Sequence, residues 1–272
     1  MVKFSELEAA QRERERYHAL SVPEGQWIVI RVDGRGFTSL TNAHFGKPFD
    51  DRFGELMATT AAAMIEEFAG LYVYTQSDEI SLLLAHSDGS FGRSVEKLVS
   101  LSAATASAAF THAAAQSVSF DSRIWTGDAV GDVVDYFAWR QADAQRNALN
   151  TCLYWALRQN GLTARQAQRR MEAMARGAKE EALADYGPAF EERPAWQRRG
   201  VGMWFETVER DGYDPRDQTR VTVIRRQLHR EPDLPGGTEY RDMVAALTGG
   251  GFPASCQAEE RRDSLARVGT QL

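Results

Sequence analysis

The sequence predicts an α+β fold of the ferredoxin-like type, in which the elements follow the order β-α-β-β-α-β. The first observation is a short, β-branched apolar run at residues 28–32. The second is a pair of apolar runs, residues 71–75 and 80–85, separated by only four residues, which is typical of a hairpin. The third is that a longer segment with helical spacing of apolar side chains precedes this pair and another follows it.

Each element has its own signal. Charged residues 5–20 predict a first, amphipathic helix with Ser5 as its N-cap. The core is then expected as a strand at 27–32, a helix at 48–69, strands at 71–75 and 80–85, a helix at 91–116 and a strand at 120–125. Beyond it we expect helices at 135–159, 163–177 and 240–247, and a hairpin of residues 200–206 and 220–227. This division predicts a core region, residues 1–134, and an appendage with a C-terminal tail, residues 135–272.

Composition restricts the class of protein. The 272 residues are 43% hydrophobic and 26% charged, as in an ordinary globular protein large enough for a sizeable core. No apolar run approaches the length of about 18 residues that a membrane span needs, and the N-terminus is too charged for a signal peptide. Cys152 and Cys256 lie far apart in the sequence, so we expect no disulfide framework and a cytoplasmic protein. The net charge of −6 disfavours a nonspecific nucleic-acid binder, although local arginine clusters could still hold a folded RNA.

Three carboxylates stand where the predicted strands end. Asp33 follows the first strand, and Asp78 and Glu79 form the tip of the hairpin. In the βαββαβ arrangement these strands can lie side by side, which brings Asp33 and Asp78 together as in the palm of a polymerase or nucleotide cyclase. Two such carboxylates can hold two Mg²⁺ ions for phosphoryl transfer. A solvated aspartate at an ordinary turn is the alternative for Asp33 taken alone.

The long helix predicted at 135–159 has an unusually polar middle, residues 140–147, between apolar and aromatic flanks. We interpret this block as facing a cleft, with a solvated helix face as the alternative. The five histidines are scattered singly, so no histidine or cysteine metal cluster is expected.

Six motifs resemble those of the tRNA(His) guanylyltransferase family, and most closely its guanylyltransferase-like 3′–5′ polymerases. They are RVDGRGF at 31–37, KPFD at 47–50, QSDEIS at 76–81, FDSR at 120–123, DYFAWRQADAQRNALN at 135–150 and WQRRGVG at 196–202. DGR or SDE alone would be a weak signal. The ordered set, which spans about two thirds of the chain, is highly specific.

The resemblance implies a polymerase-type palm whose metal ligands are Asp33, the main-chain carbonyl of Gly34, and Asp78. Glu79 matches the second acidic position of the family's SDE motif and is expected among the catalytic carboxylates. The expected contacts to nucleotide are Arg35, Gly36, Phe37 and Thr38 through their backbone, together with Lys47, Ser77, Arg93 and Arg123. Asn147 matches a position near the activated 5′ end of the RNA.

By the same resemblance, the activity is a nucleotidyltransferase that adds nucleotides in the 3′–5′ direction to the 5′ end of tRNA. Two Mg²⁺ ions are the expected cofactors, ATP and GTP or other nucleoside triphosphates the substrates, and a homo-tetramer the expected assembly, with no membrane partner. Thr38 and Gln145 stand where the tRNA(His)-specific enzymes carry histidines. This difference favours template-dependent repair of truncated tRNA over obligatory guanosine addition to tRNA(His). A nucleotide cyclase and an inactive RNA-binding palm are the alternatives.

Overall fold

The computed structural model describes residues 3–214 and 216–249 of the chain and is built on one antiparallel sheet of six strands in the order β4-β1-β3-β2-β5-β6. The strands are β1 Trp27–Arg35, β2 Tyr72–Gln76, β3 Glu79–Leu83, β4 Ser119–Gly127, β5 Val201–Asp214 and β6 Thr219–Glu231. The first four form the β4-β1-β3-β2 sheet of a ferredoxin-like fold, with β1 and β3 at its centre. The predicted α+β palm is therefore confirmed.

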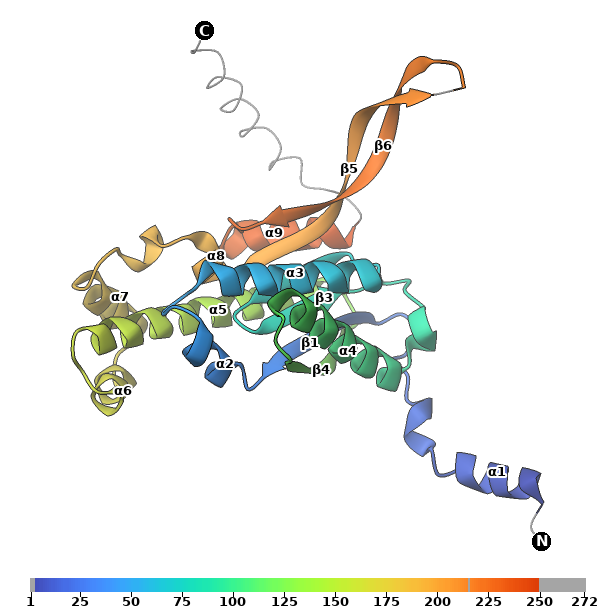
Figure 1. Cartoon of the computed structure of the whole chain (residues 1–272), viewed down its shortest axis with the longest axis horizontal. Coiled ribbons are helices and arrows are strands. Elements are labelled where there is room, and N and C mark those ends of the chain that lie inside the picture. The colour runs from blue at the N-terminus through green and yellow to red at the C-terminus, as the bar shows by residue number, and fades with distance from the viewer. Residues whose placement is uncertain (1–2, 215, 250–272) are drawn as a thin grey trace.

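Helices cover both faces of this sheet (Figure 1). Helices α3 (Asp51–Glu67) and α4 (Val95–Ala114) pack on the face that carries Ile28, Ile30 and Val32. Helices α5 (Val130–Gln159) and α9 (Gly237–Thr248) pack on the opposite face, which carries Val29. Successive side chains of a strand point to opposite faces, so the uninterrupted apolar run of β1 supplies both cores.

A third apolar cluster lies beyond the sheet, around the C-terminal half of α5. Leu149, Leu153 and Leu157 are buried there against α6 (Ala164–Glu172), α7 (Arg176–Ala184) and the short turn that carries Phe190. Helix α8 (Ala195–Arg199) then leads into β5. The 30-residue helix α5 therefore joins the sheet to this helical subregion.

Several predicted bounds are wrong. The first helix, α1, covers only Phe4–Arg12 before a 3-10 turn at Arg16–Ala19, and no side chain caps its start, so Ser5 is not the N-cap. Helix α2 (Phe37–His44) was not predicted, because eight residues are too few for a helical period to stand out in the sequence. Strand β1 continues through Asp33 to Arg35, and both strands of the C-terminal hairpin are much longer than predicted.

The hairpin continues the central sheet at its base, because β5 pairs with β2 from Thr75–Val201 to Tyr72–Trp204. The sheet thus extends across the boundary that we predicted at residue 134. The outer part of β5 and β6 projects from the body as a two-stranded arm (Figure 1). In the part of the chain that the structure describes, no helix is long and apolar enough to cross a membrane. The part of the predicted C-terminal tail from residue 250 onward lies outside the described residues.

Candidate active site

The structure brings Asp33 and Asp78 together at the ends of the two central strands. Asp33 is opposite Glu79 in the β1–β3 register, and the Gly34 N–H donates a 3.0 Å hydrogen bond to the carbonyl of Asp78. Both aspartates line a pocket of about 710 Å³, a volume in the range of small-molecule sites. The position next to Asp33 requires a glycine, because a Cβ at Gly34 would lie 2.5 Å from the ring of Phe37.

The electrostatics of this pair disfavour two bare negative charges. Burial is the largest cause that raises the pKa of Asp33, and the negative charges of Asp78, Glu79 and Asp121 raise it further. Burial also raises the pKa of Asp78, against the lowering effect of a 3.0 Å hydrogen bond from the Ser77 hydroxyl. Across residues 3–214 and 216–249, no lysine, arginine or histidine forms an ion pair with either aspartate. A cation from outside the chain would therefore relieve both the repulsion and the cost of burial.

The oxygen donors fit a hard divalent cation such as Mg²⁺. This ion is typically held by one or two carboxylates together with substrate phosphates and water. The described part of the chain holds no group of three or more histidine, cysteine, aspartate or glutamate side chains arranged for a metal. The site is thus suited to an ion that shares its coordination with a substrate.

Glu79 has a protein partner. Its carboxylate accepts two hydrogen bonds of 2.7 Å from Arg140 on α5, and Arg31 lies 4.0 Å away. Arg140 also bonds Asp143, which pairs in turn with Arg146. Since these contacts occupy the carboxylate, the structure assigns Glu79 a role in holding α5 against the sheet, and its catalytic role stays a prediction.

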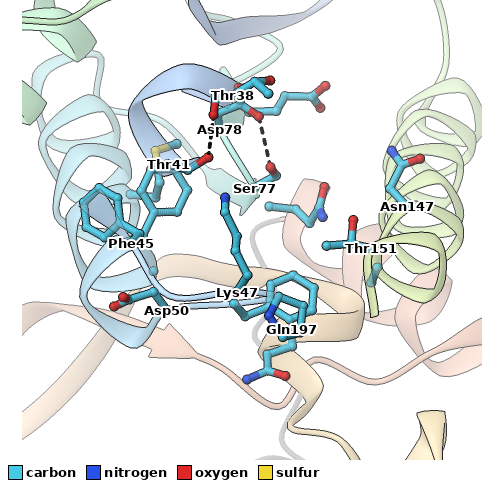
Figure 2. A pocket seen from close by; sticks show the side chains of 18 of the residues that line it. Thr38, Thr41, Phe45, Lys47, Asp50, Ser77, Asp78, Asn147, Thr151 and Gln197 are labelled. Atoms are coloured by element: carbon cyan, nitrogen blue, oxygen red, sulfur yellow. Dashed lines mark hydrogen bonds between the residues drawn. The ribbon is translucent and has the colours of Figure 1, made fainter. Parts of the chain in front are cut away.

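Lys47 is a cation that points into the pocket, which Arg140 and Arg158 also line with their guanidinium groups bonded to Glu79 and to the Leu162 carbonyl. Figure 2 shows its amino group directed toward the space between Ser77 and Thr41, with Asn147 and Thr151 of α5 across the pocket. Burial lowers the pKa of Lys47, and no acidic partner is present within the described residues. The ring centroid of Trp155 lies 6.0 Å from Nζ. An unpaired, partly desolvated ammonium is a strong partner for a phosphate.

Helix α2 begins beside this lysine. Gly36 turns the chain with φ = 76°, and the helix starts at Phe37. The N–H groups of Ser39 and Leu40 donate to the Gly36 carbonyl, whereas those of Phe37 and Thr38 come too early in the helix to have a partner within it. Thr38 in that turn lines the pocket. The side chain of Phe37 is buried in the core against Phe110 and Phe120 and anchors this turn. A helix N-terminus next to a lysine is a suitable place for a triphosphate.

The predicted nucleotide contacts are not all brought together. The structure does not support the prediction that Arg93 contacts nucleotide. Its side chain is buried, away from the pocket, and donates to the main-chain carbonyls of Val22, Asp88 and Gln26. It fixes a loop against the start of β1. Arg35 is exposed at the end of β1 and does not line the pocket.

Arg123 lies outside the pocket as well. It forms a 2.8 Å ion pair with Asp121 on β4, and its charge lowers the pKa of the neighbouring Asp33.

The polar block of α5 does face the pocket. Asn147 lines it and donates a 3.3 Å hydrogen bond to Asp143, which also lines it, whereas Gln145 does not. The sequence interpretation missed most of the aromatic and amide wall, which consists of Phe45, Phe49, Tyr154, Trp155, Trp196, Gln76 and Gln197. The FxKPF segment and the aromatic flank of the polar block were the available signals. Such a wall can hold a nucleobase by stacking and hydrogen bonding.

Comparison with known proteins agrees with this geometry. A family model described as tRNAHis guanylyltransferase matches residues 9–128, and the model of the family's C-terminal domain matches residues 131–233. A probable tRNA(His) guanylyltransferase of Mus musculus is 31% identical over 234 residues, which are 81% of this chain and 76% of the mouse protein. The chain belongs to the tRNA(His) guanylyltransferase family. It is therefore an enzyme of the nucleotidyltransferase class.

Other guanylyltransferases are similar to a comparable degree. A probable tRNA(His) guanylyltransferase of Dictyostelium discoideum is 31% identical and covers 74% of this chain and 82% of its own. Among solved structures, a bacterial tRNA(His) guanylyltransferase-like protein in complex with ATP matches 89% of this chain and 99% of its own, with a TM-score of 0.68 and 23% identity. The Saccharomyces cerevisiae guanylyltransferase matches 69% of this chain and 90% of its own, with a TM-score of 0.64. These two structures share the guanylyltransferase fold with the chain.

Proposed function

We propose that this enzyme adds nucleotides to the 5′ end of tRNA in the 3′–5′ direction, and that it repairs truncated ends against a template strand. The observation that carries the proposal is the pair Asp33 and Asp78, two half-buried carboxylates with raised pKa and no ion pair within the described residues, in one pocket with Lys47. The pocket thus offers negative oxygen donors for a metal and a positive group for a phosphate.

Each part of the pocket has a role in this proposal. Asp33, Asp78 and the carbonyl of Gly34 would hold two Mg²⁺ ions, which supply Lewis-acid stabilisation of the attacking and leaving oxygens. Lys47, the hydroxyl of Ser77 and the first turn of α2 bind and orient the triphosphate. The aromatic wall holds the base, and Asn147 lies on the side from which the RNA end enters.

The preference for repair is supported by residues 38 and 145. Thr38 lines the pocket and Gln145 lies on the half-buried side of the polar block. Neither side chain can become charged near neutral pH, unlike the histidines of the tRNA(His)-specific enzymes. The chain therefore lacks two charge-switching groups that go with the narrower activity, one in the pocket at Thr38 and one beside it on α5 at Gln145. The tetrameric assembly and the cytoplasmic location stay predictions.

A templated addition assay tests the proposal. The protein is incubated with Mg²⁺, the four nucleoside triphosphates and a tRNA that lacks its first nucleotide, in four versions that differ in the unpaired base of the 3′ strand. We expect the added nucleotide to follow that base. Addition of guanosine only, and only to tRNA(His), would overturn the repair preference. A cyclic nucleotide formed from ATP or GTP alone would instead support a cyclase.

A further inference from the structure

An exposed tryptophan stands beside the catalytic carboxylates but outside the nucleotide pocket. Trp139 on α5 is 53% exposed, an unusual value for so large an aromatic side chain. It is absent from the lining of the Asp33–Asp78 pocket and lines a separate hollow of about 490 Å³ between β4 and α5, together with Trp125 and Tyr136. Trp139 therefore lies on the β4 side of the carboxylates, outside the pocket that contains Lys47.

Guanidinium groups surround this indole. The guanidinium carbon of Arg140 lies 4.5 Å from the ring centroid of Trp139, and that of Arg31 lies 5.8 Å away. Tyr136 meets the ring edge-on at 5.9 Å. These contacts fix the indole while more than half of its surface stays open to solvent.

The sheet register connects the tryptophan to the reaction centre. Arg31 and Arg123 are opposite each other on β1 and β4, one row further along the same face than Asp33 and Asp121. Arg31 is 17% exposed and its buried Nε lies 4.0 Å from Glu79 without a hydrogen bond, whereas Arg123 is 52% exposed in a weak surface ion pair. An aromatic surface and two loosely paired arginines thus lie one row from Asp33.

This chemistry fits the end of an RNA helix. Nucleobases stack on aromatic side chains, and arginines bind the adjoining phosphates. The lining of the hollow also includes Asp128, Asp132 and Asp135, of which Asp135 pairs with Arg241, and these carboxylates disfavour a phosphate backbone there. A strand could therefore stack its last base on Trp139, but its backbone would be repelled from the hollow.

We propose that Trp139 is the stacking platform for the 5′-terminal base pair of the RNA substrate, with Arg31 and Arg123 near its phosphate. The inference rests on the proposed function, which requires an RNA end and a nucleotide to reach Asp33 from different sides. The nucleotide occupies the pocket of Lys47, and the RNA end closes the site from the side of α5 and β4.

Fluorescence of 2-aminopurine tests stacking without any chemistry. A truncated tRNA with 2-aminopurine as its first 5′ base is titrated with the full chain in EDTA, where no transfer occurs. Stacking on an indole should quench this fluorophore. Trp139→Leu, which keeps apolar bulk without the ring, should remove the quench and weaken RNA affinity by about tenfold, as expected for one lost base–aromatic stack. Trp139→Phe should restore part of both.

Three further measurements separate the outcomes. Tyr17→Ala, which removes another exposed aromatic that lines neither the pocket nor the hollow, should leave the quench unchanged. Affinity for ATP and thermal unfolding should be unchanged in Trp139→Leu, which shows that the pocket and fold are intact. An unchanged quench in that variant, or a changed oligomeric mass by light scattering with unaltered RNA affinity, would overturn the proposal. Failure of the proposed function would appear differently, as absence of nucleotide addition by the unmodified chain.

Discussion

Arg140 on α5 holds Glu79 on β3 through two parallel hydrogen bonds of 2.7 Å. The two side chains are only 10% and 14% exposed, so the ion pair is largely desolvated. This bidentate contact ties the long helix to the hairpin that carries Asp78. This charged pair therefore adds to the apolar packing that positions α5 and, with it, Asn147 across the pocket.

Arg140→Met should destabilise the protein, because it leaves the Glu79 carboxylate with little compensation in a nearly buried place. We expect the free energy of unfolding to fall by about 3 kcal/mol, measured by urea denaturation. The double variant Arg140→Met, Glu79→Met should recover most of this loss. Arg146→Met on the same helix is the control: this arginine is 71% exposed and its loss should cost less than about 0.5 kcal/mol. Equal losses for both arginines would contradict the assignment.

Asp33→Asn and Asp78→Asn should each nearly abolish nucleotide addition, because an amide is a much poorer ligand than a carboxylate for a hard dication. The double variant should lose little more, since either change disables the same site. Single-turnover addition measures this, with Asp185→Asn, an exposed carboxylate on the helical subregion, as control. A single variant that keeps more than about a tenth of the wild-type rate at modest Mg²⁺ would remove that aspartate from the metal site.

In the metal-free protein, the same substitutions that abolish activity should leave stability unchanged or raise it. The pKa values of Asp33 and Asp78 are raised in the folded state. Their contribution to the free energy of unfolding is therefore most favourable below the ordinary aspartate pKa of 3.8 and is lost as pH rises through the raised values. Asp33→Asn should therefore unfold at the same or a higher temperature than wild type in EDTA at neutral pH. The difference should shrink toward acid pH and reverse with Mg²⁺. A variant that is less stable than wild type in EDTA at neutral pH would contradict the repulsion.

Lys47→Ala should weaken use of the nucleoside triphosphate by about an order of magnitude or more, in line with about 1.5–3 kcal/mol for a charged hydrogen bond. Burial lowers the pKa of Lys47, so the affinity of the free protein for ATP should also fall as pH rises toward that value. Lys47→Arg should abolish this pH dependence, because guanidinium does not titrate there. Lys97→Ala, on the exposed side of α4, is the matched control. Unchanged kinetics over a range of triphosphate concentrations would place Lys47 outside the site.

The sequence was informative where local pattern and topology decide the outcome. The βαββαβ order follows from alternating strand and helix periodicity, and this order alone sets Asp33 beside the hairpin that bears Asp78. The polar block of α5 was visible because charged side chains interrupted an apolar helix. The order of the elements thus accounts for Asp33 and Asp78 in the pocket, and local sequence pattern accounts for the polar block of α5.

Other features depend on tertiary contacts that no local pattern reports. The partner of Glu79 is 61 residues away in the chain, so its ion pair could not be inferred from the hairpin. Arg93 carries a charge that the resemblance assigned to phosphate, whereas the fold uses its donors to satisfy three main-chain carbonyls. Helix α2 is short, and the packing of Phe37 under Gly34 stabilises it more than helical propensity does.

The pairing of β2 with β5 also has a consequence for synthesis of the protein. Strand β2 ends at Gln76, but the strand that covers its edge begins only at Val201. While the ribosome makes the intervening residues, the emerging chain presents unpaired main-chain groups at the border of its central sheet, where another strand can attach. We expect the part of the sheet formed by β1 to β4, which carries Asp33 and Asp78, to reach its native structure only after β5 has left the ribosomal exit tunnel. Truncation before Val201 should yield aggregates instead of a smaller active enzyme.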